Sequence, residues 1–179
     1  MKKSKVVRIG LAALSLFFGS ALLWGQPALA TTLWWKIAPN SCAINVTGVD
    51  HSKSDNSDYY GALGVLAGAA TPATVTAHCP VLLPQGVTMN KLRIRTFLAN
   101  GLPSYSSVTV YLKRMSWSGG MSTLATSSMT SQGATSADAD FSSSVDNESY
   151  MYTLTIYISK GSSANGTPDL GMIEIRYEQ

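Results

Sequence analysis

Residues able to perform acid, base or nucleophilic chemistry are few in this chain. Histidine, the commonest side-chain base, occurs only at positions 51 and 78, and the many serines lie in no G-x-S-x-G or H-E-x-x-H context. The four acidic residues between positions 138 and 148 could pair as glycosidase carboxylates. They lie in or beside a Ser-rich segment, where acidic groups mainly keep a chain solvated. The sequence therefore predicts a protein that is not an enzyme and needs no cofactor.

Metal ligation also has little support in the residue spacing. His78 adjoins Cys79 and His51 is far away in sequence, so no zinc pattern is present. Hard oxygen ligands that Ca²⁺ prefers occur in the segment Asp50 to Asp58 and again at Asp138 and Asp140. Neither group has EF-hand spacing, and solvated loops explain both, so we expect no metal site.

Aromatic side chains on a polar strand face are the stronger functional signal. In one segment, period-two alternation places four side chains on the same side: Tyr111, Lys113, Met115 and Trp117. The opposite side of that segment is apolar, with Val108, Val110 and Leu112. Tyr157 lies on the polar side of another strand. We predict a ligand surface centred on Tyr111 and Trp117, with Lys113 and Tyr157 at its margin. The alternative is that these rings are core, covered by a loop or by the segment Leu33 to Trp35.

Two features of the sequence predict that the chain is exported from the cytoplasm. The N-terminus has four basic residues by position 8, an uncharged run from Ile9 to Trp24, and small residues at 28 and 30. This order is typical of a cleavable signal peptide, so we expect a leader over 1–30 and a single domain over 31–179, secreted or periplasmic. No later run is long enough to cross a membrane as a helix. Cys42 and Cys79, the only cysteines, are then expected to form a disulfide.

Charge gives no sign of a nucleic-acid partner. The chain has 13 Lys and Arg residues, four of them in the leader, against 10 Asp and Glu residues, so the exported part is nearly neutral. Its densest basic group, at Lys91, Arg93 and Arg95, alternates along one strand and indicates a solvated face. The composition leaves two candidate classes of partner, a glycan or another extracellular protein.

Strand signals recur along the exported part, separated by Gly, Pro, Ser and Asn clusters, and no helical period is sustained. The predicted strands cover 33–38, 42–47, 60–66, 73–79, 91–99, 107–115, 122–129, 151–159 and 171–178. One apolar and one polar face per strand indicate antiparallel sheets that are packed on one side. The sequence predicts an all-β, two-sheet antiparallel β-sandwich, jelly-roll-like, of about eight or nine strands, with a closed barrel as the alternative. The segments 50–58 and 130–144 are expected to be polar loops.

Two segments carry a family resemblance. Val145 to Tyr152 (VDNESYMY) resembles the V-D-N-x-x-Y-x-Y start of a strand in exported bacterial β-sandwich domains without an assigned activity. Leu170 to Tyr177 (LGMIEIRY) resembles their closing strand, L-x-G-V-x-I-x-Y, although Gly171 directly follows Leu170 and Met172 replaces the usual Val. The resemblance implies a sandwich and no chemistry.

Three functions remain open. The leading one is a non-catalytic exported module with a structural, adhesive or binding role. A carbohydrate-binding module is the first alternative, because of the rings at 111, 117 and 157. A fimbrial-type subunit is the second, because the chain is similar to chaperone-assembled pilins in length, early cysteine pair and aromatic-ending last strand. It departs from them at Glu178, where a penultimate Tyr is expected.

Overall fold

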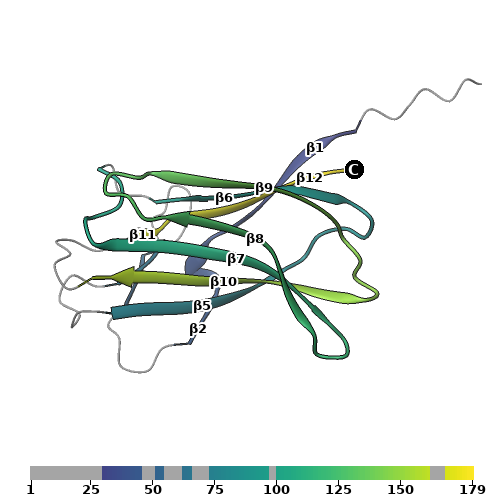
Figure 1. Ribbon diagram of the computed structural model, residues 1–179, viewed down its shortest axis with the longest axis horizontal. Helices are drawn as coiled ribbons and strands as arrows, with labels where there is room; N and C mark the ends of the chain where they lie inside the picture. Colours follow the sequence, from purple (N-terminus) through teal and green to yellow (C-terminus); the bar gives the residue numbers. More distant parts are fainter. Residues whose placement is uncertain (1–29, 46–50, 55–61, 66–72, 97–99, 162–167) are drawn as a thin grey trace, which may run out of the picture.

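The computed structural model describes residues 30–45, 51–54, 62–65, 73–96, 100–161 and 168–179. These residues form two antiparallel sheets, of four and five strands, layered face to face, with a three-stranded sheet at one end (Figure 1). The predicted all-β sandwich is therefore confirmed. Within the described residues, no helix is long and apolar enough to cross a membrane. The expected leader, apart from Ala30, lies outside them.

The four-stranded sheet pairs the start of the described chain with its end. Its strand order is β1 (Thr32–Ile37), β12 (Met172–Glu178), β6 (Thr88–Arg95) and β9 (Ser136–Ser144). The register of β1 against β12 runs from Thr32 opposite Glu178 to Ile37 opposite Ile173. The position beside the last strand is thus filled by a strand of the same chain.

The five-stranded sheet carries the longest strands. Its order is β2 (Ala43–Ile44), β5 (Ala73–Val81), β10 (Tyr150–Lys160), β7 (Ser106–Ser116) and β8 (Met121–Met129). The small sheet has the order β11 (Asp169–Leu170), β4 (Ala62–Val65) and β3 (His51–Ser54). A short 3-10 helix, η1 (Pro39–Ser41), carries the chain from β1 to β2.

The core is built from the apolar half of each alternation. From the five-stranded sheet, the fully buried side chains include Val108, Val110, Leu112, Leu154, Ile156 and Ile158. From the four-stranded sheet they include Leu92, Ile94, Ile173 and Ile175. Burial of one such side chain contributes about 1.5–3 kcal/mol, so the alternation determines which face of each strand turns inward.

The expected loop over 130–144 is wrong in its second half. Residues Ser136–Ser144 form β9, which pairs antiparallel with β6 at the edge of the four-stranded sheet. The inward positions of β9 include Ala137, Ala139 and Phe141, and its outward positions include Asp138 and Asp140. Small inward residues suffice for an edge strand, and the two aspartates pair with cations on β6.

The other expected loop, 50–58, also contains a strand. Residues His51–Ser54 form β3, with His51 opposite Val65 and Ser54 opposite Ala62, while Asp50 and residues 55–58 lie outside the described residues. Of the predicted strand 42–47, only Ala43–Ile44 form β2; residues 46 and 47 lie outside the described part. A strand as short as β2 has little alternation by which to recognise its ends.

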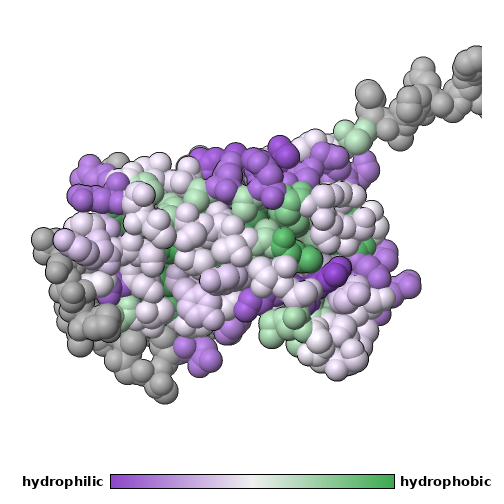
Figure 2. Space-filling view, in the orientation of Figure 1, coloured by the Kyte–Doolittle hydropathy of each residue, from purple (hydrophilic) through white to green (hydrophobic). Residues whose placement is uncertain are grey.

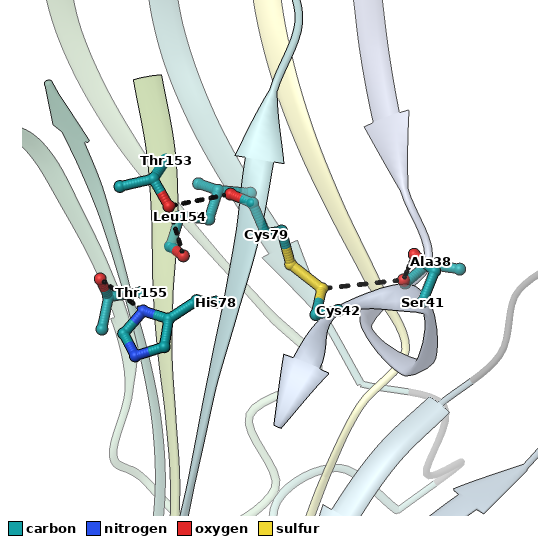
Figure 3. Close-up of a disulfide and its surroundings, with 8 residues drawn as sticks. All are labelled: Ala38, Ser41, Cys42, His78, Cys79, Thr153, Leu154 and Thr155. Carbon is teal, nitrogen blue, oxygen red and sulfur yellow. Dashed lines mark hydrogen bonds between the residues drawn. A yellow bond between two sulfur atoms is a disulfide. The ribbon is translucent and has the colours of Figure 1, made fainter. Parts of the chain in front are cut away.

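A disulfide joins Cys42 to Cys79, as the sequence predicts, with the Cα atoms 4.7 Å apart (Figure 3). Cys42 follows η1, where the chain has left the four-stranded sheet, and Cys79 lies in β5 of the other sheet. The bond therefore fixes the point at which the chain crosses between the two layers. Ser41 Oγ donates to the Ala38 carbonyl at 2.7 Å and holds the turn beside it.

Candidate functional site

The outward face of the five-stranded sheet is rich in hydroxyl groups. Its outward positions on β5 are Thr74, Thr76, His78 and Pro80, and on β10 they are Met151, Thr153, Thr155, Tyr157 and Ser159. On β7 they are Ser107, Thr109, Tyr111, Lys113 and Met115, and on β8 Met121, Thr123, Thr126 and Ser128. None of these positions carries a carboxylate, so Lys113 supplies the one formal charge among the described outward residues of these four strands.

Three predicted site residues meet at the centre of this face. Tyr111 lies opposite Thr155 and Tyr157 opposite Thr109, so the two tyrosines are diagonal neighbours on adjacent strands. Their ring centroids are 5.7 Å apart and the ring planes are perpendicular. Lys113 Nζ lies 5.4 Å from the centroid of the Tyr111 ring, within range of a cation–π interaction. Lys113 therefore caps one ring of the pair.

The rings remain accessible. Tyr157 is 37% exposed and Tyr111 is half-buried, and no described residue of another layer covers them. The alternative in which the rings form core is therefore wrong for the described part of the chain. The segment Leu33 to Trp35, considered as a cover, forms β1 in the opposite sheet.

Cross-strand hydroxyl bonds hold the surface beside the tyrosine pair. Thr109 Oγ1 and Ser128 Oγ are 2.8 Å apart, and Thr74 Oγ1 and Ser159 Oγ are 2.9 Å apart. Thr155 Oγ1 lies 3.4 Å from His78 Nδ1 (Figure 3). A ligand on this face would meet hydroxyl groups whose positions are already set by their neighbours.

Trp117 lies apart from this group. Strand β7 ends at Ser116, so the alternation that would place Trp117 beside Tyr111 stops one residue early. The indole is 65% exposed, and its Nε1 donates to the Glu148 carbonyl at 2.6 Å. It lines a hollow of about 300 Å³ whose other walls include Leu82, Tyr150 and Met151. The structure brings Tyr111, Lys113 and Tyr157 together and separates Trp117 from them.

A second hollow lies between Trp117's hollow and the tyrosine pair. It has a volume of about 420 Å³ and is lined mainly by apolar atoms of Ala43, His78, Cys79, Pro80, Met115, Met151 and Thr153. The two hollows share Pro80 and Met151. Neither His78 nor Met151 is among the site residues that the sequence predicts. The only sequence signal for them is that both lie on the outward side of their strands.

The opposite face of the sandwich, on the four-stranded sheet, carries a network of ion pairs. Arg93 Nε donates to Asp138 at 2.8 Å, and Lys91 Nζ lies 2.7 Å from Asp140. Hydrogen bonds from Arg93 hold the pKa of Asp138 down at about 2, and the bond to Asp140 raises the pKa of Lys91. Figure 2 shows hydrophilic residues gathered along the upper side, over β6 and β9, above a paler surface over β7 and β8.

These ion pairs also bear on calcium binding and acid catalysis by the aspartates of β9. Asp138 and Asp140 lie on a strand rather than in a loop, and both are engaged with cations of β6. A metal ion would have to displace Lys91 and Arg93. Across the described ranges, no three His, Cys, Asp or Glu residues are grouped so that they could hold a metal ion. Of the other calcium candidates, Asp50 and the acidic residues at 55–58 lie outside those ranges.

No protein-family model matches the chain, and no curated protein matches its sequence. Several solved structures share its β-sandwich. A CBM22–GH10 xylanase fragment from Clostridium thermocellum matches with a TM-score of 0.45 and 11% identity over 78% of this chain and 26% of that one. A β-1,3-glucan-binding CBM6 from Bacillus halodurans matches with 0.38 and 10% over 80% and 92%. The cellobiose complex of CsCBM6-3 from Clostridium stercorarium matches with 0.36 and 14% over 80% and 90%.

These likenesses concern the fold alone. The chain spans about a quarter of the length of the xylanase fragment and nearly the whole length of the two CBM6 modules. The chain has a β-sandwich similar to those of carbohydrate-binding modules, and no sequence family is assigned to it.

Proposed function

We propose that this protein is an exported, non-catalytic glycan-binding module. Its binding surface is the outward face of the five-stranded sheet, at Tyr111, Tyr157 and Lys113. The observation that carries the proposal is the perpendicular pair of accessible tyrosine rings, 5.7 Å apart, on a face without carboxylates in its described part.

The chemistry of a pyranose fits this surface. One side of a sugar ring is lined by C–H groups and packs on an aromatic face, while its hydroxyls exchange hydrogen bonds with polar neighbours. Tyrosine provides a large rigid contact at low entropic cost. Hydroxyl groups of Thr109 and Ser128 lie on the same face, with Thr109 directly opposite Tyr157.

Export is part of the same proposal. The Cys42–Cys79 disulfide is of the kind that persists in an oxidising compartment, and the expected leader would deliver the chain there. Extracellular polysaccharide is then the ligand class available to such a surface.

The proposal is tested by retention of the purified protein on insoluble glucans and xylan and on an immobilised uronate polymer. Wild-type protein should be retained on at least one of them. Tyr111→Ala and Tyr157→Ala should each lose most of the retention, because truncation of an aromatic anchor commonly costs about 2 kcal/mol or more. Tyr105→Ala is the matched control: this tyrosine is well exposed but lies in the turn before β7.

Two results would contradict glycan binding at this face. One is a wild-type protein that no polysaccharide retains. The other is equal retention of the Tyr111 and Tyr157 variants, with their unfolding midpoints unchanged.

A further inference from the structure

Three methionines form a single row across the outward face of the five-stranded sheet. Met151 of β10 lies directly opposite Met115 of β7, and Met115 lies directly opposite Met121 of β8. Cβ atoms of directly opposed residues in antiparallel strands lie about 4.5–5.5 Å apart. The long, unbranched side chains of the outer two can therefore bring their Sδ atoms toward that of Met115. We call these residues the thioether row.

Exposure sets the two outer methionines of the row apart from the other described methionines, since Met115 is half-buried like Met172 of the other sheet. Met121 is 60% exposed and Met151 is 43% exposed, whereas Met89 and Met129 are buried in the core. Burial of such a side chain is favourable by about 1.5–3 kcal/mol, so packing does not explain two exposed methionines on either side of a half-buried one. A soft donor function would require that accessibility.

The donor set determines which ion the row could take. Thioether sulfur is a soft ligand that favours Cu(I) over Mg²⁺, Ca²⁺ or Mn²⁺, which prefer oxygen. No carboxylate lies among the outward residues of β5, β10, β7 and β8 described above. Both cysteines are consumed in the disulfide, so no thiol of the chain competes for a soft ion.

Two nearby groups bear on the charge at the row. Lys113 is two residues from Met115 on the same face, but its ammonium lies over the Tyr111 ring, on the side away from the row. His78 lines the 420 Å³ hollow together with Met115 and Met151. On β5, however, it lies in the cross-strand row of Thr155 and Tyr111, not in that of the methionines.

From these observations we propose that Met115, Met121 and Met151 form a binding site for a soft monovalent cation, Cu(I) or its analogue Ag(I). Met115 is the central ligand, because it is the member directly opposed to both of the others. The site is distinct from the tyrosine pair and does not depend on glycan binding.

The test uses the exported protein with its disulfide intact and Ag(I), which needs no reductant. Calorimetric titration should show one ion bound per chain. With methionine methyl groups labelled for NMR, the three methyls of the thioether row should shift together. Met115→Leu should weaken Ag(I) binding by about tenfold or more, because loss even of a supporting group costs metal sites that much. Met121→Leu and Met151→Leu should each weaken it as well.

Control variants distinguish the thioether row from Ag(I) binding elsewhere on the chain. Leucine conserves volume, and near-ultraviolet circular dichroism checks that each variant is folded. Met172→Leu, on the other sheet, and His78→Gln should bind Ag(I) like the wild type, and Zn²⁺ should not bind. Unchanged affinity in Met115→Leu, loss of binding in His78→Gln, or equally tight Zn²⁺ binding would each overturn the proposal.

Discussion

The Tyr152 hydroxyl accepts a hydrogen bond from the backbone N–H of Asp146 at 2.8 Å, closing the corner between β9 and β10. The same hydroxyl lies 3.4 Å from the Ser144 carbonyl, to which it donates. Asp146 Oδ1 accepts from the N–H groups of Glu148 and Ser149, and Asn147 Nδ2 donates to the Leu83 carbonyl at 2.9 Å. The VDNESYMY segment thus folds on itself and ties the corner to the chain after β5.

Removal of this hydroxyl should destabilise the fold. Tyr152→Phe keeps the buried ring but leaves the Asp146 N–H without its acceptor, which costs about 1–3 kcal/mol. Urea unfolding should show a lower midpoint with an unchanged slope. Tyr150→Phe is the control, since Tyr150 contacts Arg114 through its ring, and its midpoint should hardly move. Equal midpoints for the two variants would mean that the corner bond contributes nothing.

The ion pairs between the aspartates of β9 and the cations of β6 should make the free energy of unfolding fall at acid pH. The pKa of Asp138 is lowered to about 2, first by its hydrogen bond from Arg93, whereas in the unfolded chain it is about 3.9. A carboxyl whose pKa is depressed on folding stabilises the protein above the unfolded value. That contribution is lost as the pH falls from about 4 to about 2.

Asp138→Asn should remove this part of the acid sensitivity. The unfolding free energy of the wild type should fall more steeply than that of Asp138→Asn between pH 4 and pH 2. The difference should be modest, because the Asp138 side chain is 34% exposed and solvent screens the pair. If the unfolding free energies of the two proteins ran parallel over this interval, the Arg93–Asp138 pair would contribute nothing to stability.

The disulfide should contribute substantially to stability, since it spans a sequence separation of 37 residues. On the chain-entropy model a loop of this size is worth about 4 kcal/mol. The double variant Cys42→Ser with Cys79→Ser should unfold at a correspondingly lower urea concentration. Two alkylatable cysteines in the unreduced wild-type protein would instead show that the bond does not form.

The strands were predictable where their inward residues are large and branched, as in β7 with Val108, Val110 and Leu112. Strand β9 was missed because Ala137 and Ala139, at its inward positions, give only a weak apolar alternation, and its aspartates resemble those of a solvated loop. Glu174 alternates with two buried isoleucines of β12, a pattern that predicts a solvated side chain. It is nevertheless only 5% exposed, because Lys36 and Arg95 of the neighbouring strands contact it from both sides. Such partners depend on strand order, which alternation within one strand does not reveal.

The site was predictable only as far as single strands allow. Tyr111 and Lys113 share a strand, and their common face followed from the alternation. The contact between Tyr111 and Tyr157 and the thioether row both depend on the register between strands, which the sequence does not specify. Alternation continued through residue 117 groups Trp117 with Tyr111, whereas β7 ends one residue earlier, at Ser116.

The position of Trp117 leads to a last prediction, that it takes no part in glycan binding at the tyrosine pair. Its indole lies in the turn after β7 and donates a hydrogen bond to the Glu148 carbonyl. The hollow that it lines has neither Tyr111 nor Tyr157 in its wall. Trp117→Ala should therefore stay folded, with a loss of less than about 1 kcal/mol, because the hydrogen bond it removes is exposed. It should be retained on the polysaccharide like the wild type, whereas Tyr111→Ala is not. Joint loss of retention in both variants, with unfolding midpoints intact, would instead mean one continuous surface from Tyr111 to Trp117.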